Sequence, residues 1–75
     1  MKMSWRTTDA VSFGRALRER RKKLHYTQAF LSDFSGFSVS FISDLERGKA
    51  TAELGKALFL ASLLGLDLTL AERGE

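Results

Sequence analysis

Two short apolar-patterned segments joined by a glycine turn are the strongest constraint on how this chain of 75 residues can fold. In residues 28–35 and 39–47, apolar side chains recur at the three- and four-residue spacing typical of helices that bury one face. Only Gly36, Phe37 and Ser38 separate the two segments. The sequence therefore predicts two short helices held close together by a tight turn.

Because the chain contains no proline, glycines and capping residues mark the helix ends. Asp9, Thr27 and Ser38 each precede an apolar stripe, and their side-chain oxygens can accept from the free amides of a first turn. Thr51 or Ala52 is expected to open a last helix. We predict four helices, over residues 10–24, 28–35, 39–47 and about 52–64. Residues 1–8 are assigned to an N-terminal arm, 9–65 to the folded domain and 66–75 to a C-terminal tail for dimerisation.

Length and composition exclude several protein classes. A chain this short forms one domain with a marginal core of its own. With no cysteine and one histidine, disulfides, thiolate zinc sites and cysteine nucleophiles are excluded, and we expect no enzyme activity, no cofactor and no metal. The longest apolar run, residues 57–61, is far shorter than the roughly 18 residues of a membrane span. We expect a cytoplasmic protein.

Charge is distributed unevenly along the sequence. Residues 1–25 carry eight Lys and Arg against two acidic residues, a net charge of +6, whereas the remainder carries −3. This asymmetry favours a face that binds a polyanion, and the alternative is a solvated basic helix. If this face binds a polyanion, Arg15, Arg18 and Lys22 are candidates for attracting it over a long range.

The C-terminal part of the sequence predicts contact with a second copy. The last predicted helix is apolar almost all round, which calls for burial on more than one side. Residues 66–70 then read Leu-Asp-Leu-Thr-Leu, the alternation of a half-buried strand. Since no other strand is predicted, we expect Leu66, Leu68 and Leu70 to pair with the same strand of a second subunit. A disordered or helix-extending tail is the alternative.

A short helix, a glycine turn and a second short helix form the motif whose later helix lies in the DNA major groove. Residues 13–65 resemble the phage-repressor-like (Cro-type, or XRE) helix-turn-helix family. The residues that carry this resemblance are Thr27-Gln28 to Leu31, Gly36-Phe37-Ser38, Ile42-Ser43 and Leu45-Glu46-Arg47-Gly48-Lys49.

Within that family, the chain looks most like the HipB-type antitoxins, on Arg21-Lys22, on residues 41–49 and on the Leu-Gly-Leu that follows. The resemblance implies an all-α, lambda-repressor-like bundle of four to five helices, with a short C-terminal β-strand pairing across a dimer. It also implies a homodimeric repressor that binds a palindromic operator in double-stranded DNA. The partner that it implies is a HipA-like serine/threonine kinase toxin, neutralised by this chain as an antitoxin.

DNA contacts are expected around the second and third helices. At the start of the second helix, Gln28 is placed to hold a phosphate, a role that the resemblance also assigns. Arg47 and Lys49 are expected on phosphates, and the groove-facing residues offer no Arg, Asn or Gln for bidentate base contacts. Specificity is therefore expected to rest partly on DNA shape or dimer spacing. The predicted DNA-binding residues are Thr27, Gln28, Ser38, Val39, Ser40, Ser43, Asp44, Arg47 and Lys49.

Structural roles are expected for two further positions. The resemblance pairs Arg21 with Glu46 as a buried salt bridge that contacts no DNA. It also places His25 where relatives commonly have glycine, so we expect a positive φ angle there and no acid-base chemistry.

Phe30 and Phe34 lie one turn apart on the second helix, where the family usually carries polar residues. We predict that they bind a partner protein or the second subunit, with Trp5 as a candidate third member. The alternative is that both rings fold back onto Phe37 or the tail. This pair also supports the runner-up function, a protein-interaction module that uses a helix-turn-helix scaffold without specific DNA readout.

Overall fold

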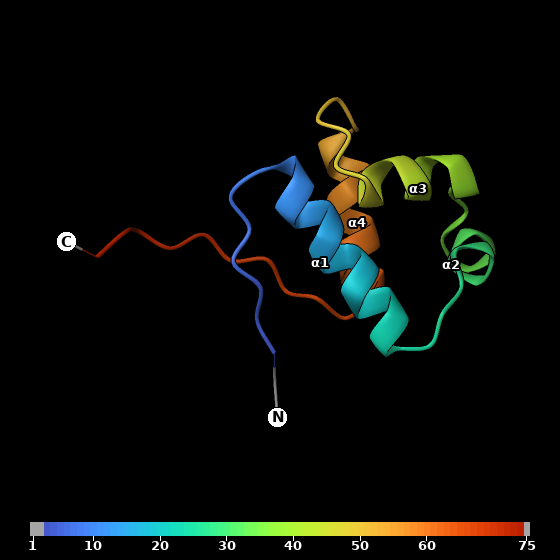
Figure 1. Cartoon of the computed structure of the whole chain (residues 1–75), viewed down its shortest axis with the longest axis horizontal. Coiled ribbons are helices and arrows are strands. Elements are labelled where there is room, and N and C mark those ends of the chain that lie inside the picture. Colours follow the sequence, from blue (N-terminus) through green and yellow to red (C-terminus); the bar gives the residue numbers. More distant parts are fainter. Residues whose placement is uncertain (1–2, 75) are drawn as a thin grey trace.

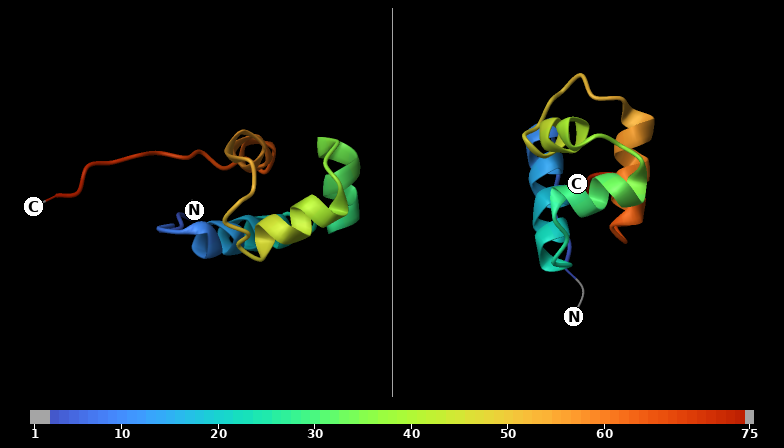
Figure 2. Two further views of the ribbon diagram at one scale, coloured as in Figure 1. Left: turned by 90° about the horizontal axis from the view of Figure 1, so that it is seen from above. Right: turned by 90° about the vertical axis from the view of Figure 1, so that its right-hand side faces the viewer.

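The computed structural model describes residues 3–74 as an all-helical domain. In this part of the chain there are four helices, α1 (Ala10–Lys23), α2 (Gln28–Ser35), α3 (Val39–Glu46) and α4 (Leu54–Leu63). Figure 1 shows α2 and α3 on one side of α1 and α4, with the C-terminal tail extending to the other side. The right-hand view of Figure 2 separates α1 from α4 and shows α2 crossing in front of this pair. No helix of the described residues is long and apolar enough to cross a membrane.

Local capping forms the first three helices as predicted. The carboxylate of Asp9 accepts from the Ser12 amide at 2.8 Å, and the Asp9 amide donates to the Ser12 hydroxyl at 3.2 Å, which completes a capping box. Thr27 and Ser38 accept from the amides of the third residues of α2 and α3 at 2.9 and 3.0 Å. Gly36 ends α2 in the left-handed conformation, with φ 84°.

The fourth helix begins later than expected. It starts at Leu54 rather than at Thr51 or Ala52, because residues 49–52 form a turn in which the Ala52 amide donates to the Lys49 carbonyl at 3.3 Å. Glu53 precedes α4 without a side-chain capping bond. No side-chain cap therefore marks the start of this helix.

The end of α1 has the backbone conformation predicted at His25, whose φ is 64°. The His25 amide donates to the Lys22 carbonyl at 2.9 Å, and the next amide, of Tyr26, donates to the Arg21 carbonyl at 3.1 Å. These bonds satisfy the last carbonyls of α1 and turn the chain toward α2.

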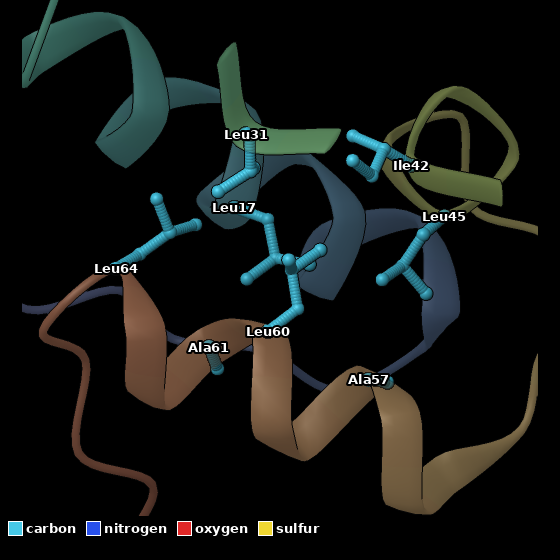
Figure 3. Packing of buried hydrophobic residues seen from close by; sticks show 8 residues of the cluster. All are labelled: Leu17, Leu31, Ile42, Leu45, Ala57, Leu60, Ala61 and Leu64. Atoms are coloured by element: carbon cyan, nitrogen blue, oxygen red, sulfur yellow. The ribbon is translucent and has the colours of Figure 1, made fainter. Parts of the chain in front are cut away.

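One apolar core joins all four helices (Figure 3). The largest fully buried side chains come from every helix and from the residue after α4, and complete burial of such a side chain stabilises by about 1.5–3 kcal/mol. The buried apolar residues that form this cluster are Leu17, Leu31, Ile42, Leu45, Ala57, Leu60, Ala61 and Leu64.

The predicted C-terminal strand is absent from the single chain. Residues 66–70 carry no strand, and along them the side chains change from half-buried Leu66 to Leu68, which is 49% exposed, and Leu70, which is fully exposed. A strand needs a neighbour to receive its backbone hydrogen bonds, and a single copy of this all-helical domain offers none. The single chain therefore gives no support for the strand, and its pairing with a second copy stays a prediction.

Candidate nucleic-acid interface

A buried ion pair attaches α3 to α1. Arg21 Nε and Glu46 Oε2 are 2.7 Å apart, a second bond joins Arg21 Nη2 to Glu46 Oε1 at 3.0 Å, and the two side chains are 9% and 3% exposed. Arg21 Nη1 also donates to the Tyr26 carbonyl at 2.8 Å. The guanidinium therefore holds the end of α3 and the loop before α2 in one orientation relative to α1.

Gln28 takes part in the same group, a contact that the sequence pattern did not indicate. Its Nε2 donates to Glu46 Oε1 at 3.0 Å, which links the start of α2 to the end of α3. A side-chain amide nitrogen carries two hydrogens, so this bond uses one and leaves the other for an outside acceptor. Thr27 precedes Gln28 and is exposed to solvent.

One face of α3 gathers most of the other predicted DNA-binding residues. Ile42, Leu45 and Glu46 are buried against the domain. The opposite face carries the four positions 40, 43, 44 and 47, spaced as a single stripe. Val39, 42% exposed, and the exposed cap Ser38 stand at the start of this stripe. Helix packing therefore directs a polar surface of α3 to solvent.

Charges at the end of α3 are paired with one another. Arg47 Nη2 lies 2.7 Å from Asp44 Oδ1, and Lys49 Nζ lies 3.6 Å from Asp44 Oδ2. Arg47 Nη1 also donates to the hydroxyl of Ser43. Both oxygens of the Asp44 carboxylate thus face a cation, which offsets the repulsion that this carboxylate would exert on a phosphate.

The basic residues of α1 divide into structural and exposed groups. Arg20 is half-buried, and its Nε donates to the Leu64 carbonyl at 2.7 Å, where it satisfies the end of α4. Arg15, Arg18 and Lys22 are exposed.

Within residues 3–74, no cluster of three or more His, Asp or Glu side chains could hold a metal ion.

Aromatic side chains form a row that begins with half-buried Tyr26, in the loop before α2, and continues along α2 with two exposed phenylalanines. We call Tyr26, Phe30 and Phe34 the aromatic surface. Its ring centroids are 4.8 Å and 6.1 Å apart in sequence order, and the two phenylalanines are 48% and 59% exposed. Phe37 instead packs edge-on against Phe41, at a centroid distance of 5.2 Å.

Trp5 is placed elsewhere in the structure. Its Nε1 donates to Glu19 Oε1 on α1 at 2.8 Å, so it does not add to the row of rings on α2. Phe59 of α4 meets Phe37 edge-on at 5.9 Å, in a second aromatic group that belongs to the packing between α3 and α4.

Known proteins share this fold and sequence pattern. The family model HTH_3, described as helix-turn-helix, matches residues 17–70. The chain belongs to this helix-turn-helix family. Its similarity extends to y4mF of Sinorhizobium fredii (strain NBRC 101917 / NGR234), named an uncharacterized HTH-type transcriptional regulator, which is 34% identical over 73 residues, 97% of this chain and 96% of the relative.

Solved structures with the same helix-turn-helix fold include complexes of HipB. A HipB–O2 20mer complex superposes with a TM-score of 0.86 at 21% identity, over 96% of this chain and 100% of that one. A HipA–HipB–O2–O3 complex contains a chain that superposes with a TM-score of 0.84 at 20% identity. The match covers 95% of this chain and 100% of that one. At this identity the likeness shows the fold.

Proposed function

We propose that this chain is a sequence-specific DNA-binding repressor. The observation that carries the proposal is the solvent-facing stripe of α3, held to α1 and α2 by the buried group of Arg21, Glu46 and Gln28. A rigidly held helix with a polar outer face suits insertion into the major groove. Support comes from the HipB complexes with 20mers, which we interpret as operator DNA, and from the regulator named as a relative.

In this proposal phosphate contacts surround the stripe and position it. Lys49 and the start of α3 at Ser38 meet one strand of DNA, and the second hydrogen of the Gln28 amide meets a phosphate beside the start of α2. The exposed basic side chains of α1 add long-range attraction for the DNA. The nine residues proposed to contact DNA are Thr27, Gln28, Ser38, Val39, Ser40, Ser43, Asp44, Arg47 and Lys49.

We further propose that two copies bind together. A groove of about 520 Å³ runs between the start of α1, the turn after α3, α4 and the tail. Its rim includes Leu54, which is 70% exposed, and Leu58, which is 41% exposed. The exposed tail residues Leu68 and Leu70 also line it. A second copy that covers this groove would give residues 66–70 the strand partner they lack. Recognition helices about 34 Å apart then call for a palindromic operator.

Antitoxin activity toward a HipA-like serine/threonine kinase is the second part of the proposal. A solved complex of the same fold contains HipA together with HipB. In this chain the aromatic surface is the candidate docking site for the kinase. Phe30 and Phe34 lie about 200° and 240° around α2 from Gln28, so the side that meets DNA stays free. Kinase and operator can therefore be bound at the same time.

One alternative function follows from the same surface. A protein-interaction module without specific DNA readout would need the aromatic surface and would make no use of the α3 stripe. The internal pairing of Asp44 with Arg47 and Lys49 favours this alternative, because it reduces the free positive charge on α3.

The deciding experiment is fluorescence anisotropy on duplex DNA from upstream of the gene for this chain and on a scrambled duplex, over a salt series. A repressor is expected to prefer the first duplex by about a thousandfold. If a dimer neutralises about six phosphates, log affinity falls against log salt with a slope of roughly −5. Equal and weak binding to both duplexes would reject the repressor and leave the interaction module.

A further inference from the structure

The solvent-facing stripe of α3 includes one side chain capable of strong base discrimination. That side chain belongs to the residue directly after the helix. Val39, Ser40, Ser43 and Asp44 offer a methyl contact, two hydroxyls and a carboxylate. Hydroxyls contact several bases with little preference, whereas a guanidinium donates two parallel bonds to O6 and N7 of guanine. Arg47, the residue that follows α3, is the nearest guanidinium in sequence.

The side chain of Arg47 folds back along α3 instead of extending away from it. Its Nη1 bonds to Ser43 and its Nη2 to Asp44, four and three residues earlier. The guanidinium is thereby set back by about one helical turn, roughly 5.4 Å, onto the middle of the stripe. The side chain stays 69% exposed, so it remains accessible to a ligand.

We infer that Arg47 is the guanine-reading residue of this protein and that Asp44 is the positioning residue that holds it. The inference rests on the proposed repressor function and assigns that site its main specificity contact. A guanidinium already held by a carboxylate loses less side-chain entropy when it binds a base edge. Asp44, one of the nine residues proposed above to contact DNA, is thereby reassigned: it acts on base recognition through Arg47 and makes no base contact of its own.

Lys49 takes the phosphate contact instead. Its ammonium is 3.6 Å from the second carboxylate oxygen of Asp44, a longer separation than the 2.7 Å between Asp44 and Arg47. A looser pair exchanges more readily for a phosphate, and an ammonium binds phosphate as a point charge without the fork that guanine requires. The pairing within the protein thus separates a fixed base reader from an exchangeable phosphate contact.

The test uses the full chain and its upstream duplex in which single guanines are replaced by 7-deazaguanine, symmetrically in both half-sites. This base lacks the N7 acceptor. We expect one substituted position to weaken wild-type binding by about tenfold or more, the scale of one bidentate base contact. Arg47→Ala should bind the unmodified duplex with a comparable loss and should show no further loss at that position.

Two more variants separate positioning from charge. Asp44→Asn keeps Arg47 but removes the carboxylate, and we expect it to lower the preference for the upstream over the scrambled duplex about tenfold without weakening binding to the scrambled duplex. Lys49→Ala is the matched control for a phosphate contact, which should weaken binding to both duplexes by the same factor. Thermal melting should be unchanged in all three variants, since these side chains are on the surface.

The outcomes distinguish the inference from the function on which it rests. If wild type does not distinguish the two duplexes, the repressor function fails and the inference fails with it. If wild type does distinguish them, two results overturn only the inference. In the first, Arg47→Ala loses affinity at every 7-deazaguanine position where wild type does; in the second, Asp44→Asn strengthens binding to both duplexes equally. In that case Arg47 is a phosphate contact, as its place after the helix indicates from sequence.

Discussion

Gly14 of α1 lies directly against the carbonyl oxygen of Leu45 near the end of α3. A Cβ at position 14 would be 2.2 Å from that oxygen and 2.8 Å from the carbonyl oxygen of Glu46. The absence of a side chain at Gly14 therefore lets α1 and α3 approach until Arg21 reaches Glu46. This close approach sets the angle at which the outer face of α3 is presented.

Gly14→Ala is expected to destabilise the domain by about 1–3 kcal/mol, because the added methyl group meets backbone atoms that cannot move away easily. Gly55→Ala is the matched control. Gly55 also lies in a helix, but a Cβ there meets no atom within 4 Å, so alanine should stabilise by about 0.5–1 kcal/mol. Urea unfolding followed by circular dichroism measures both. Equal stability of the two variants would contradict the contact.

Breaking the buried ion pair should cost more than replacing it. Glu46→Gln leaves the Arg21 guanidinium buried without its carboxylate, and we expect a loss of about 3–5 kcal/mol in the free energy of unfolding. The double variant Arg21→Met with Glu46→Leu leaves no buried charge and should lose less than the single variant. Chemical denaturation gives both values, and a larger loss in the double variant would disprove this account of the pair.

Asp9 should make stability depend on acid pH. The Ser12 amide, together with the Ser12 hydroxyl, donates to the carboxylate and lowers the pKa of Asp9 below its ordinary 3.8. Its contribution is therefore complete above pH 3.8 and is lost as the pH falls through the lower pKa of the folded state. Asp9→Asn keeps a capping oxygen without a titrating group. The stability difference between wild type and this variant should shrink in acid, and a constant difference in denaturation series would count against the assignment.

Charge on the aromatic surface should abolish the proposed kinase binding and preserve the fold. In the variant Phe30→Glu with Phe34→Lys, two rings that are half-exposed are replaced, so we expect thermal stability and DNA binding to remain within the range of surface substitutions. If the antitoxin proposal holds, co-purification with the proposed HipA-like kinase should be lost. If the melting temperature collapses instead, the rings belong to the core and the docking proposal fails.

Leu68→Lys should weaken the proposed dimer, while Thr69→Lys should not. In an extended segment successive side chains point to opposite sides, so the two variants place the same charge on different faces of the tail. Light scattering over a concentration series gives the oligomeric state. An unchanged dimer in Leu68→Lys, or equal weakening in both, would refute pairing through the leucine face.

The helix ends were predictable where the determining contacts lie within a few residues. The hydroxyl of Thr27 meets an amide three residues later, and Gly36 ends the same helix through its own φ angle. Such contacts depend on local sequence order, so the pattern of caps and glycines already predicts α2 and the start of α3. The same regular spacing supported the resemblance to the helix-turn-helix family, which the family match over residues 17–70 confirms.

Tertiary structure alone decided the contacts between residues that are distant in the chain. Gln28 meets Glu46 across 18 positions, and no side-chain cap at Glu53 marks the start of α4. The strand predicted for residues 66–70 needs a partner outside the single chain. Local pattern indicates which face of a helix is apolar, but the side chain that meets it depends on how the helices pack.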